Sequence, residues 1–363
     1  MSTATPPEIR EWTTAEGVSI FRLPLEAFPG FWAYAYLVRL GEGWVLIDSG
    51  SGVESANEDL DEGLRAVEVP WERLTHLLLT HGHIDHFGGV NYVRQRAPQV
   101  QIGVHELGRR TVTNYEERLA VVARRLRGFL LEAGVRPQRV DALLQMYLSL
   151  KTFFQSEKVD FTYEAVGMVL GPLRLLHLPG HCSGQVAMRL DDVLFVGDHV
   201  LSDISPHQAP ESLTLYTGLG HYLASLRALE NWTSGVRLTL GGHQRPIEDL
   251  RARIEAIRQV HRERLAKVLA LLEKPHTVAE VSWALFGEVH GYNVLLALEE
   301  AGAHVEYLYL HGCLGIANLA EVEQADGGVP LRYYRLPGIR APRGACGARS
   351  TWEGDGSALH PVA

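Results

Sequence analysis

Leu74-Thr75-His76-Leu77-Leu78-Leu79, followed by Thr80-His81-Gly82-His83-Ile84-Asp85-His86-Phe87-Gly88-Gly89, is the stretch that decides the fold. The run 74–79 predicts a buried strand, because it is short, continuous and compatible with β structure. Four potential metal ligands follow where that strand ends, and open α/β folds place their ligand sites at such ends. His81 and His83 are two residues apart, so in extended backbone they point to the same side. Asp85 and His86 come after the chain has turned and are expected to face a second position nearby.

The composition describes an ordinary globular protein. The chain has 363 residues, 46% hydrophobic and 21% charged, which predicts one large domain plus a smaller one. The formal net charge of −9 disfavours a broad surface for nucleic acid or membranes. Three cysteines, far apart and in no CxxC pair, favour a reducing compartment. Residues 1–12 contain no hydrophobic signal core and no apolar stretch approaches the ~20 residues of a membrane span, so we expect a cytoplasmic protein.

The first half of the chain alternates strands with helices. Short β-like runs fill residues 17–48, and the last of them ends at Asp48-Ser49-Gly50. Amphipathic helices are predicted at 54–67 and 87–96, and a further strand at 100–104. This alternation predicts a layered α/β core. Residues 106–165 differ, with helical periodicity at 114–133 and 137–154, and are interpreted as a helical insertion.

In the second half, strands again end beside a histidine or an aspartate. We predict strands at 173–178, 186–190, 193–196 and 236–240, and a helix at 217–231. Three of these strands are followed by His181, Asp198 and His243, each next to a glycine that lets the backbone turn and leaves room for a ligand. Imidazole and carboxylate groups are the donors that zinc and similar divalent ions take when no thiolate is offered. The strand-end donors exceed the need of one tetrahedral ion and divide between two; they are His81, His83, Asp85, His86, His181, Asp198 and His243.

By THGHIDH (80–86), LPGHCSG (178–184), FVGDH (195–199) and GGH (241–243), in that order, the chain resembles the metallo-β-lactamase superfamily over about residues 15–250. The resemblance implies a four-layer αββα sandwich and a hydrolase whose metal-bridging hydroxide attacks the substrate. It also implies that one metal is held by His81, His83 and His181, and the other by Asp85, His86 and His243. Asp198 would bridge the two ions.

The same resemblance implies further roles. Asp85 or Asp198 would relay the proton, and Asp48 would orient ligands by hydrogen bonds. Two divalent ions are expected as cofactors, zinc in the first instance, although iron and manganese suit the same ligands. Well-known metallo-β-lactamases have a cysteine where this chain has Asp198, which favours the branches similar to glyoxalase II and to the nucleases over antibiotic hydrolysis.

The segment after residue 250 is predicted to form a smaller domain. Helices are expected at 248–273, at 277–286 with a capping box of Thr277 and Glu280, and at 292–310. Two β-like pieces at 320–323 and 331–336 complete a pattern that resembles a winged helix. The predicted domains are therefore 1–250 and 251–336, with a flexible tail at 337–363.

The charge of this C-terminal segment argues against a nucleic-acid partner. Between Pro275 and Leu331 there is no Lys or Arg, against eight Asp or Glu, and phosphate neutralisation supplies most of the affinity for nucleic acid. We expect the segment to cover the active-site mouth or to mediate formation of a homodimer.

Three functional classes remain at this point. The first is hydrolysis of a small-molecule ester, thioester or lactone. The second is a phosphodiesterase or endoribonuclease, whose phosphate path would be the six arginines between Arg118 and Arg139. The third, a binding module with a vestigial site, is disfavoured by the complete ligand set.

Overall fold

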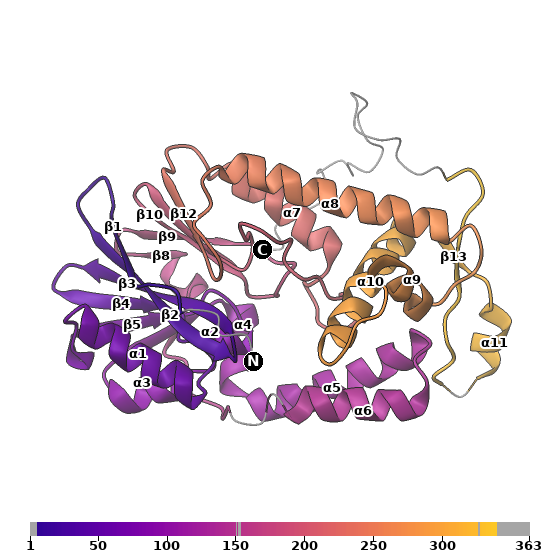
Figure 1. Cartoon of the computed structure of the whole chain (residues 1–363), viewed down its shortest axis with the longest axis horizontal. Helices are drawn as coiled ribbons and strands as arrows, with labels where there is room; N and C mark the ends of the chain where they lie inside the picture. Colours follow the sequence, from indigo (N-terminus) through magenta and orange to yellow (C-terminus); the bar gives the residue numbers. More distant parts are fainter. Residues whose placement is uncertain (1–5, 150, 152–153, 326, 340–363) are drawn as a thin grey trace.

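The computed structural model describes residues 6–149, 151, 154–325 and 327–339. Two β-sheets packed face to face lie on the left in the view of Figure 1. The first sheet has the order β1-β2-β3-β4-β5-β6-β7. Its strands are antiparallel up to β4 and parallel from β4 onward. The strands are β1 (Arg10–Thr13), β2 (Ser19–Phe28), β3 (Phe31–Leu40), β4 (Gly43–Ile47), β5 (Leu74–Leu78), β6 (Gln101–Val104) and β7 (Phe161–Thr162).

The second sheet has the order β12-β11-β10-β9-β8. Neighbouring strands are antiparallel except for the parallel pair β11–β12. Its strands are β8 (Val169–Leu170), β9 (Leu173–His177), β10 (Val186–Leu190), β11 (Val193–Gly197) and β12 (Leu238–Gly241). The parallel pairs, among them β4–β5 and β11–β12, bring the ends of distant strands to the same edge of the molecule.

Successive side chains of a strand point to opposite faces of its sheet, and this alternation produces the layers of the fold. In β3, Tyr34, Tyr36 and Val38 pack between the two sheets, whereas Ala35 and Leu37 pack against helices on the outer face. The outer face of the first sheet is covered by α1 (Glu54–Ala66), α2 (Ile84–Phe87) and α3 (Val90–Arg96), and that of the second by α7 (Leu219–Glu230) and α8 (Leu250–Leu271) (Figure 1). The predicted four-layer αββα sandwich is confirmed.

The predicted helical insertion contains α4 (Glu106–Thr113), α5 (Tyr115–Glu132) and α6 (Pro137–Ser149). It is shorter than expected, because β7 lies inside the predicted range 106–165 and pairs with β6. Helix α6 ends at Ser149, not at Phe154 as predicted. The side chain of Phe154 instead packs on Phe87 of α2, with ring centroids 4.7 Å apart, so its burial does not require a helix.

After α8 the chain forms α9 (Val278–Phe286), α10 (Asn293–Leu310), β13 (Leu314–Ile316), α11 (Leu319–Gln324) and β14 (Tyr333–Arg335). The capping box of Thr277 and Glu280 is present. The prediction of a β-like piece at 320–323 was wrong: these residues lie in α11, whose sequence consists largely of helix formers. The first strand of the terminal hairpin is β13, which pairs with β14. The winged-helix assignment and the domain boundaries stay predictions, and most of the predicted flexible tail (340–363) lies outside the described residues.

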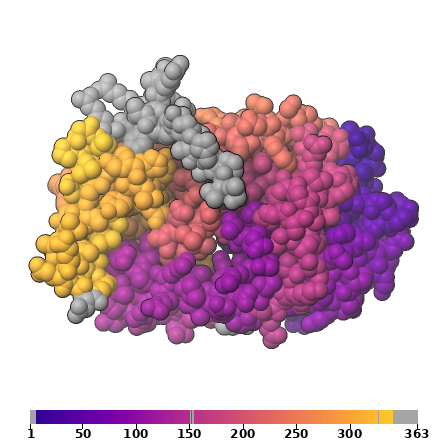
Figure 2. All heavy atoms as spheres, turned by 180° about the vertical axis from the view of Figure 1, so that it is seen from behind, coloured from indigo at the N-terminus to yellow at the C-terminus, as the bar shows by residue number. Residues whose placement is uncertain are grey.

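Helices α5 and α6 pack against α10, although more than 140 residues separate the starts of α6 and α10 in the chain. Leu130, Leu144 and Tyr147 share one buried cluster with Leu295 and Leu298. Figure 2 shows the insertion, in purple, lying beside the orange and yellow C-terminal segment. Among the described helices, none is long and apolar enough to cross a membrane.

Candidate metal centre

Strand ends and one short helix deliver all seven predicted donors to one place. His81 follows β5, His83 is the N-cap residue of α2, and Asp85 and His86 lie within α2. His181 follows β9, Asp198 follows β11, and His243 follows β12. Because β4, β5, β11 and β12 end on the same edge, donors more than 150 residues apart in the sequence become neighbours.

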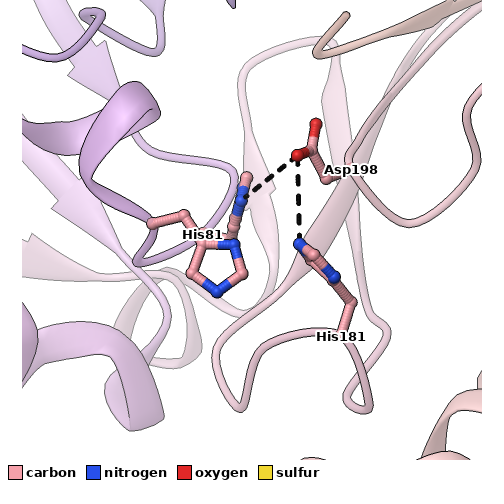
Figure 3. Close-up of side chains that lie close together, drawn as sticks. His81, His181 and Asp198 are labelled. Carbon is pink, nitrogen blue, oxygen red and sulfur yellow. Dashed lines mark ion pairs between the residues drawn. The ribbon is translucent and has the colours of Figure 1, made fainter. Parts of the chain in front are cut away.

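The first group consists of His81, His83, His181 and Asp198, whose donor atoms all lie within 4.8 Å of one another. The Nε2 atoms of His81 and His181 each lie 3.9 Å from Oδ2 of Asp198, and both imidazoles point at this carboxylate (Figure 3). Both Nε2 atoms are buried and have no hydrogen-bond partner within the described residues. Buried nitrogen atoms without a partner are costly, and a cation between them removes that cost.

The second group consists of Asp85, His86, Asp198 and His243. Nε2 of His243 lies 3.1 Å from Oδ2 of Asp198 and 3.3 Å from Oδ2 of Asp85. Nε2 of His86 lies 3.2 Å from Nε2 of His243. Asp198 is the one residue common to both groups, since its carboxylate lies between them.

Asp48 holds the loop that carries His81, His83 and His86 through hydrogen bonds to Thr80 and His86. Its Oδ2 atom lies 3.0 Å from Nδ1 of His86 and accepts a 2.7 Å hydrogen bond from the hydroxyl of Thr80, while Oδ1 accepts one from the Thr80 amide. Asp48 adopts a positive φ of 61°, which is unusual for a residue with a side chain and aims the carboxylate at the loop. The contact with Nδ1 leaves Nε2 of His86 free for the second group.

Two more imidazoles are oriented by backbone carbonyls. His243 donates from Nδ1 to the carbonyl of Trp32, and His181 donates from Nδ1 to the carbonyl of His207, both at 2.8 Å. Each bond leaves Nε2 directed at the centre. The part played by His207 was not predicted, because it lies in a long loop whose sequence gives no signal of the contact.

Gly242 makes room for the second group. A Cβ atom at this position would lie 2.2 Å from Oδ1 of Asp198 and 2.5 Å from Cε1 of His86. The end of β12 and Gly242 are held to β3, because the amide of Tyr34 donates to the Gly242 carbonyl and the hydroxyl of Tyr36 donates to the Gly241 carbonyl. These two hydrogen bonds oppose a backbone shift that would make room for a side chain at residue 242.

Electrostatics distinguish the two groups. Burial and the neighbouring imidazoles lower the pKa of His81 and His83 well below 6.5, so both are neutral and offer a lone pair at pH 7. In the second group burial acts in the same direction, but the carboxylate of Asp198 outweighs it and raises the pKa of His243 to about 10. Burial alone would raise the pKa of Asp85, but the charge of His86 and the hydrogen bond from His243 outweigh it and lower that pKa. The carboxylates are therefore ionised and suited to a cation.

Two further residues of the quoted motifs, His199 and Cys182, lie outside the two groups. His199 is fully buried beside the ring of Tyr222, and Cys182 is a buried free thiol. Of the arginines between 118 and 139, Arg127 pairs with Asp141, and Arg125 donates to the carbonyl of Leu213. These two are thus engaged within the protein.

A four-layer αββα sandwich with two overlapping histidine–aspartate groups at its strand ends defines a class of metal-dependent hydrolases. The family model of the metallo-beta-lactamase superfamily matches residues 31–265. The chain belongs to this superfamily.

Similar proteins support the assignment over most of the chain. The probable metallo-hydrolase YqjP of Bacillus subtilis (strain 168) is 26% identical over 305 residues, covering 81% of this chain and 93% of that protein. The lactamase-like protein adaB of Aspergillus niger is 25% identical, over 66% of this chain and 58% of that protein. The crystal structure of a metallo-beta-lactamase family protein from Thermus thermophilus superposes with a TM-score of 0.69 at 27% identity, covering 87% of this chain and 98% of that one.

Proposed function

We propose that the protein is a dinuclear metal-dependent hydrolase that acts on an ester, thioester or lactone. The observation that carries the proposal is the sharing of Asp198 by two groups that each hold three further donors. One ion would be held by His81, His83 and His181, and the other by Asp85, His86 and His243, with Asp198 between them. All seven donors are nitrogen or oxygen, which suits zinc.

Bound divalent ions supply a hydroxide nucleophile at neutral pH and neutralise charge that develops on the substrate. The chain's own residues contribute position and proton transfer. Asp48, Trp32 and His207 hold three of the imidazoles in orientation through their Nδ1 atoms. Asp85 is the better candidate for relaying the proton, because its side chain is 15% exposed against 8% for Asp198.

The proposed test compares substrate classes on metal-loaded protein. Thioesters, esters and lactones would be assayed beside bis(p-nitrophenyl) phosphate, before and after removal of metal with a chelator. Turnover of one of the first three, lost on chelation and restored by zinc, is the expected result. Full activity of a metal-free preparation would contradict it.

The same set of substrates also tests the alternative function, a phosphodiesterase or endoribonuclease. Turnover of the phosphodiester alone, abolished by Arg124→Glu together with Arg125→Glu, would replace the proposal. The engagement of Arg125 and Arg127 within the protein leaves fewer free arginines for a phosphate path and favours a small-molecule hydrolase.

A further inference from the structure

A lysine without an anionic partner at contact distance lies at the end of the insertion, within electrostatic range of His83 and Asp85. Lys151 lies two residues after Ser149, the last residue of α6, and its side chain is half-buried. Within the part of the chain that the structure describes, its ammonium group forms no ion pair; Nζ instead lies 5.1 Å from the centre of the Tyr147 ring. A partly desolvated ammonium gains from an anion, and none of the described side chains provides one at contact distance.

The backbone of Lys151 is fixed on both sides. Its amide donates to the carbonyl of Leu148 at 2.9 Å, and its own carbonyl accepts a 2.9 Å hydrogen bond from the hydroxyl of Tyr115. Tyr115 packs on Phe87, with ring centroids 5.8 Å apart, and Phe87 follows His86 in α2. The end of the insertion is therefore tied to the same short helix that carries Asp85 and His86.

The C-terminal segment reaches the first group through His207. Oε2 of Glu299, in α10, lies 3.5 Å from Nε2 of His207. The backbone carbonyl of His207 accepts the hydrogen bond from His181. The charges of Lys151 and Glu299 are close enough to influence each other's pKa, and Lys151 also influences the pKa of His83. Lys151 thus lies within electrostatic range of both the first group and α10.

The net charge around Lys151 and the metal centre would be positive once two divalent ions are bound. Two divalent ions would carry four positive charges against the three carboxyl groups of Asp85, Asp198 and Glu299, and Lys151 and the half-buried Arg118 add two more positive charges near them. Burying positive charge without a counterion is costly, so the arrangement favours a negatively charged substrate.

We propose that Lys151 binds a carboxylate carried by the acyl part of the substrate, at the end away from the bond that is hydrolysed. This inference rests on the proposed hydrolytic function and gives it a substrate class: a thioester or ester of a dicarboxylic acid. The specificity would come from the insertion, since Lys151 belongs to none of the strand ends that hold the metals.

Binding of small acids tests the proposal without turnover. Valerate and glutarate have equal chain length but carry one and two carboxylates, and their affinities for zinc-loaded protein would be measured by titration calorimetry, with succinate and adipate to vary the length. At least one dicarboxylate is expected to bind about tenfold more tightly than valerate. Lys151→Met should abolish that preference and Lys151→Arg should keep it. Lys267→Met, which changes an exposed lysine on α8, is the matched control.

Three results would overturn the proposal. They are no preference for a dicarboxylate in the wild type, an unchanged preference in Lys151→Met, and an equal loss of affinity for the monocarboxylate and the dicarboxylate in that variant. A parallel turnover assay separates this proposal from the hydrolytic one. It would compare the glutaryl and valeryl thioesters of one thiol. Preference for dicarboxylates without turnover would refute only the hydrolytic function. Turnover with no preference would refute only the role of Lys151.

Discussion

Oδ2 of Asp198 lies 3.1 Å from Nε2 of His243, and the same atom lies 3.9 Å from Nε2 of His81. One carboxylate thus joins a histidine that follows β5 in the first sheet to one that follows β12 in the second. The relation makes Asp198 the residue on which both groups depend.

Replacing Asp198 is therefore expected to damage both metal positions. Asp198→Ala should lower the metal content from two ions to one or fewer per chain and abolish hydrolysis. Asp85→Asn should affect the second position and leave the ion held by His81, His83 and His181 in place. Elemental analysis of the purified variants measures the difference, and two tightly held ions in Asp198→Ala would contradict the shared carboxylate.

Asp48→Asn is expected to weaken metal binding without removing a ligand. The substitution places an amide where Oδ2 now faces Nδ1 of His86 and the Thr80 hydroxyl, so His86 loses its orientation. Loss of such an outer contact costs roughly 10- to 100-fold in metal affinity. Competition with a chromogenic chelator measures the affinity. Asp141→Asn, on the exposed face of α6, is the control and should bind metal like the wild type.

Gly242→Ala is expected to disrupt the centre sterically. The new methyl group would lie 2.2 Å from Oδ1 of Asp198, so the carboxylate must move. Activity and metal affinity should fall at least about tenfold, whereas overpacking at one position costs the fold only about 1–3 kcal/mol. Gly220→Ala in α7 is the control, because its Cβ would have no neighbour closer than 3.8 Å. Comparable activity in the two variants would refute the steric argument.

Glu299 gives a prediction on pH and stability. Burial raises its pKa to about 7, although the charge of Lys151 opposes the shift. In the unfolded chain the group ionises near its ordinary pKa of 4.5, so the folded state holds the proton more strongly. The resulting stabilisation is complete below pH 4.5 and is lost as the pH rises through 7.

Glu299→Gln cannot ionise and should therefore gain stability relative to the wild type between about pH 5 and pH 8, by on the order of 1–3 kcal/mol. Denaturant unfolding at the two pH values measures the change. Glu248→Gln changes a carboxylate with an 89% exposed side chain and should show no such trend. A constant difference between Glu299→Gln and wild type at both pH values would contradict the assigned shift.

Much of the sandwich and the positions of the seven candidate donors at or just after strand ends could be predicted from sequence, because both depend on local patterns. The apolar run before His81 and the glycines beside His181, Asp198 and His243 mark strand ends within a few residues of each donor. The C-terminal hairpin was harder. Residues 320–323 resemble a short strand, but the surrounding helix formers decided in favour of α11, and the true strand β13 is only three residues long.

The sequence by itself determined which donors are available and that each lies where a strand ends, because ligand type and strand periodicity are short-range properties. Only the tertiary structure decided how these donors combine. The packing of the two sheets placed Asp198 in both groups, and the positive φ of Asp48 aimed its carboxylate at His86. The packing of Tyr115 on Phe87, together with the hydrogen bond from Tyr115 to the Lys151 carbonyl, tied the end of the insertion to α2, and α10 brought Glu299 to His207. Such contacts join residues far apart in the chain through burial of apolar surface, which no local pattern specifies.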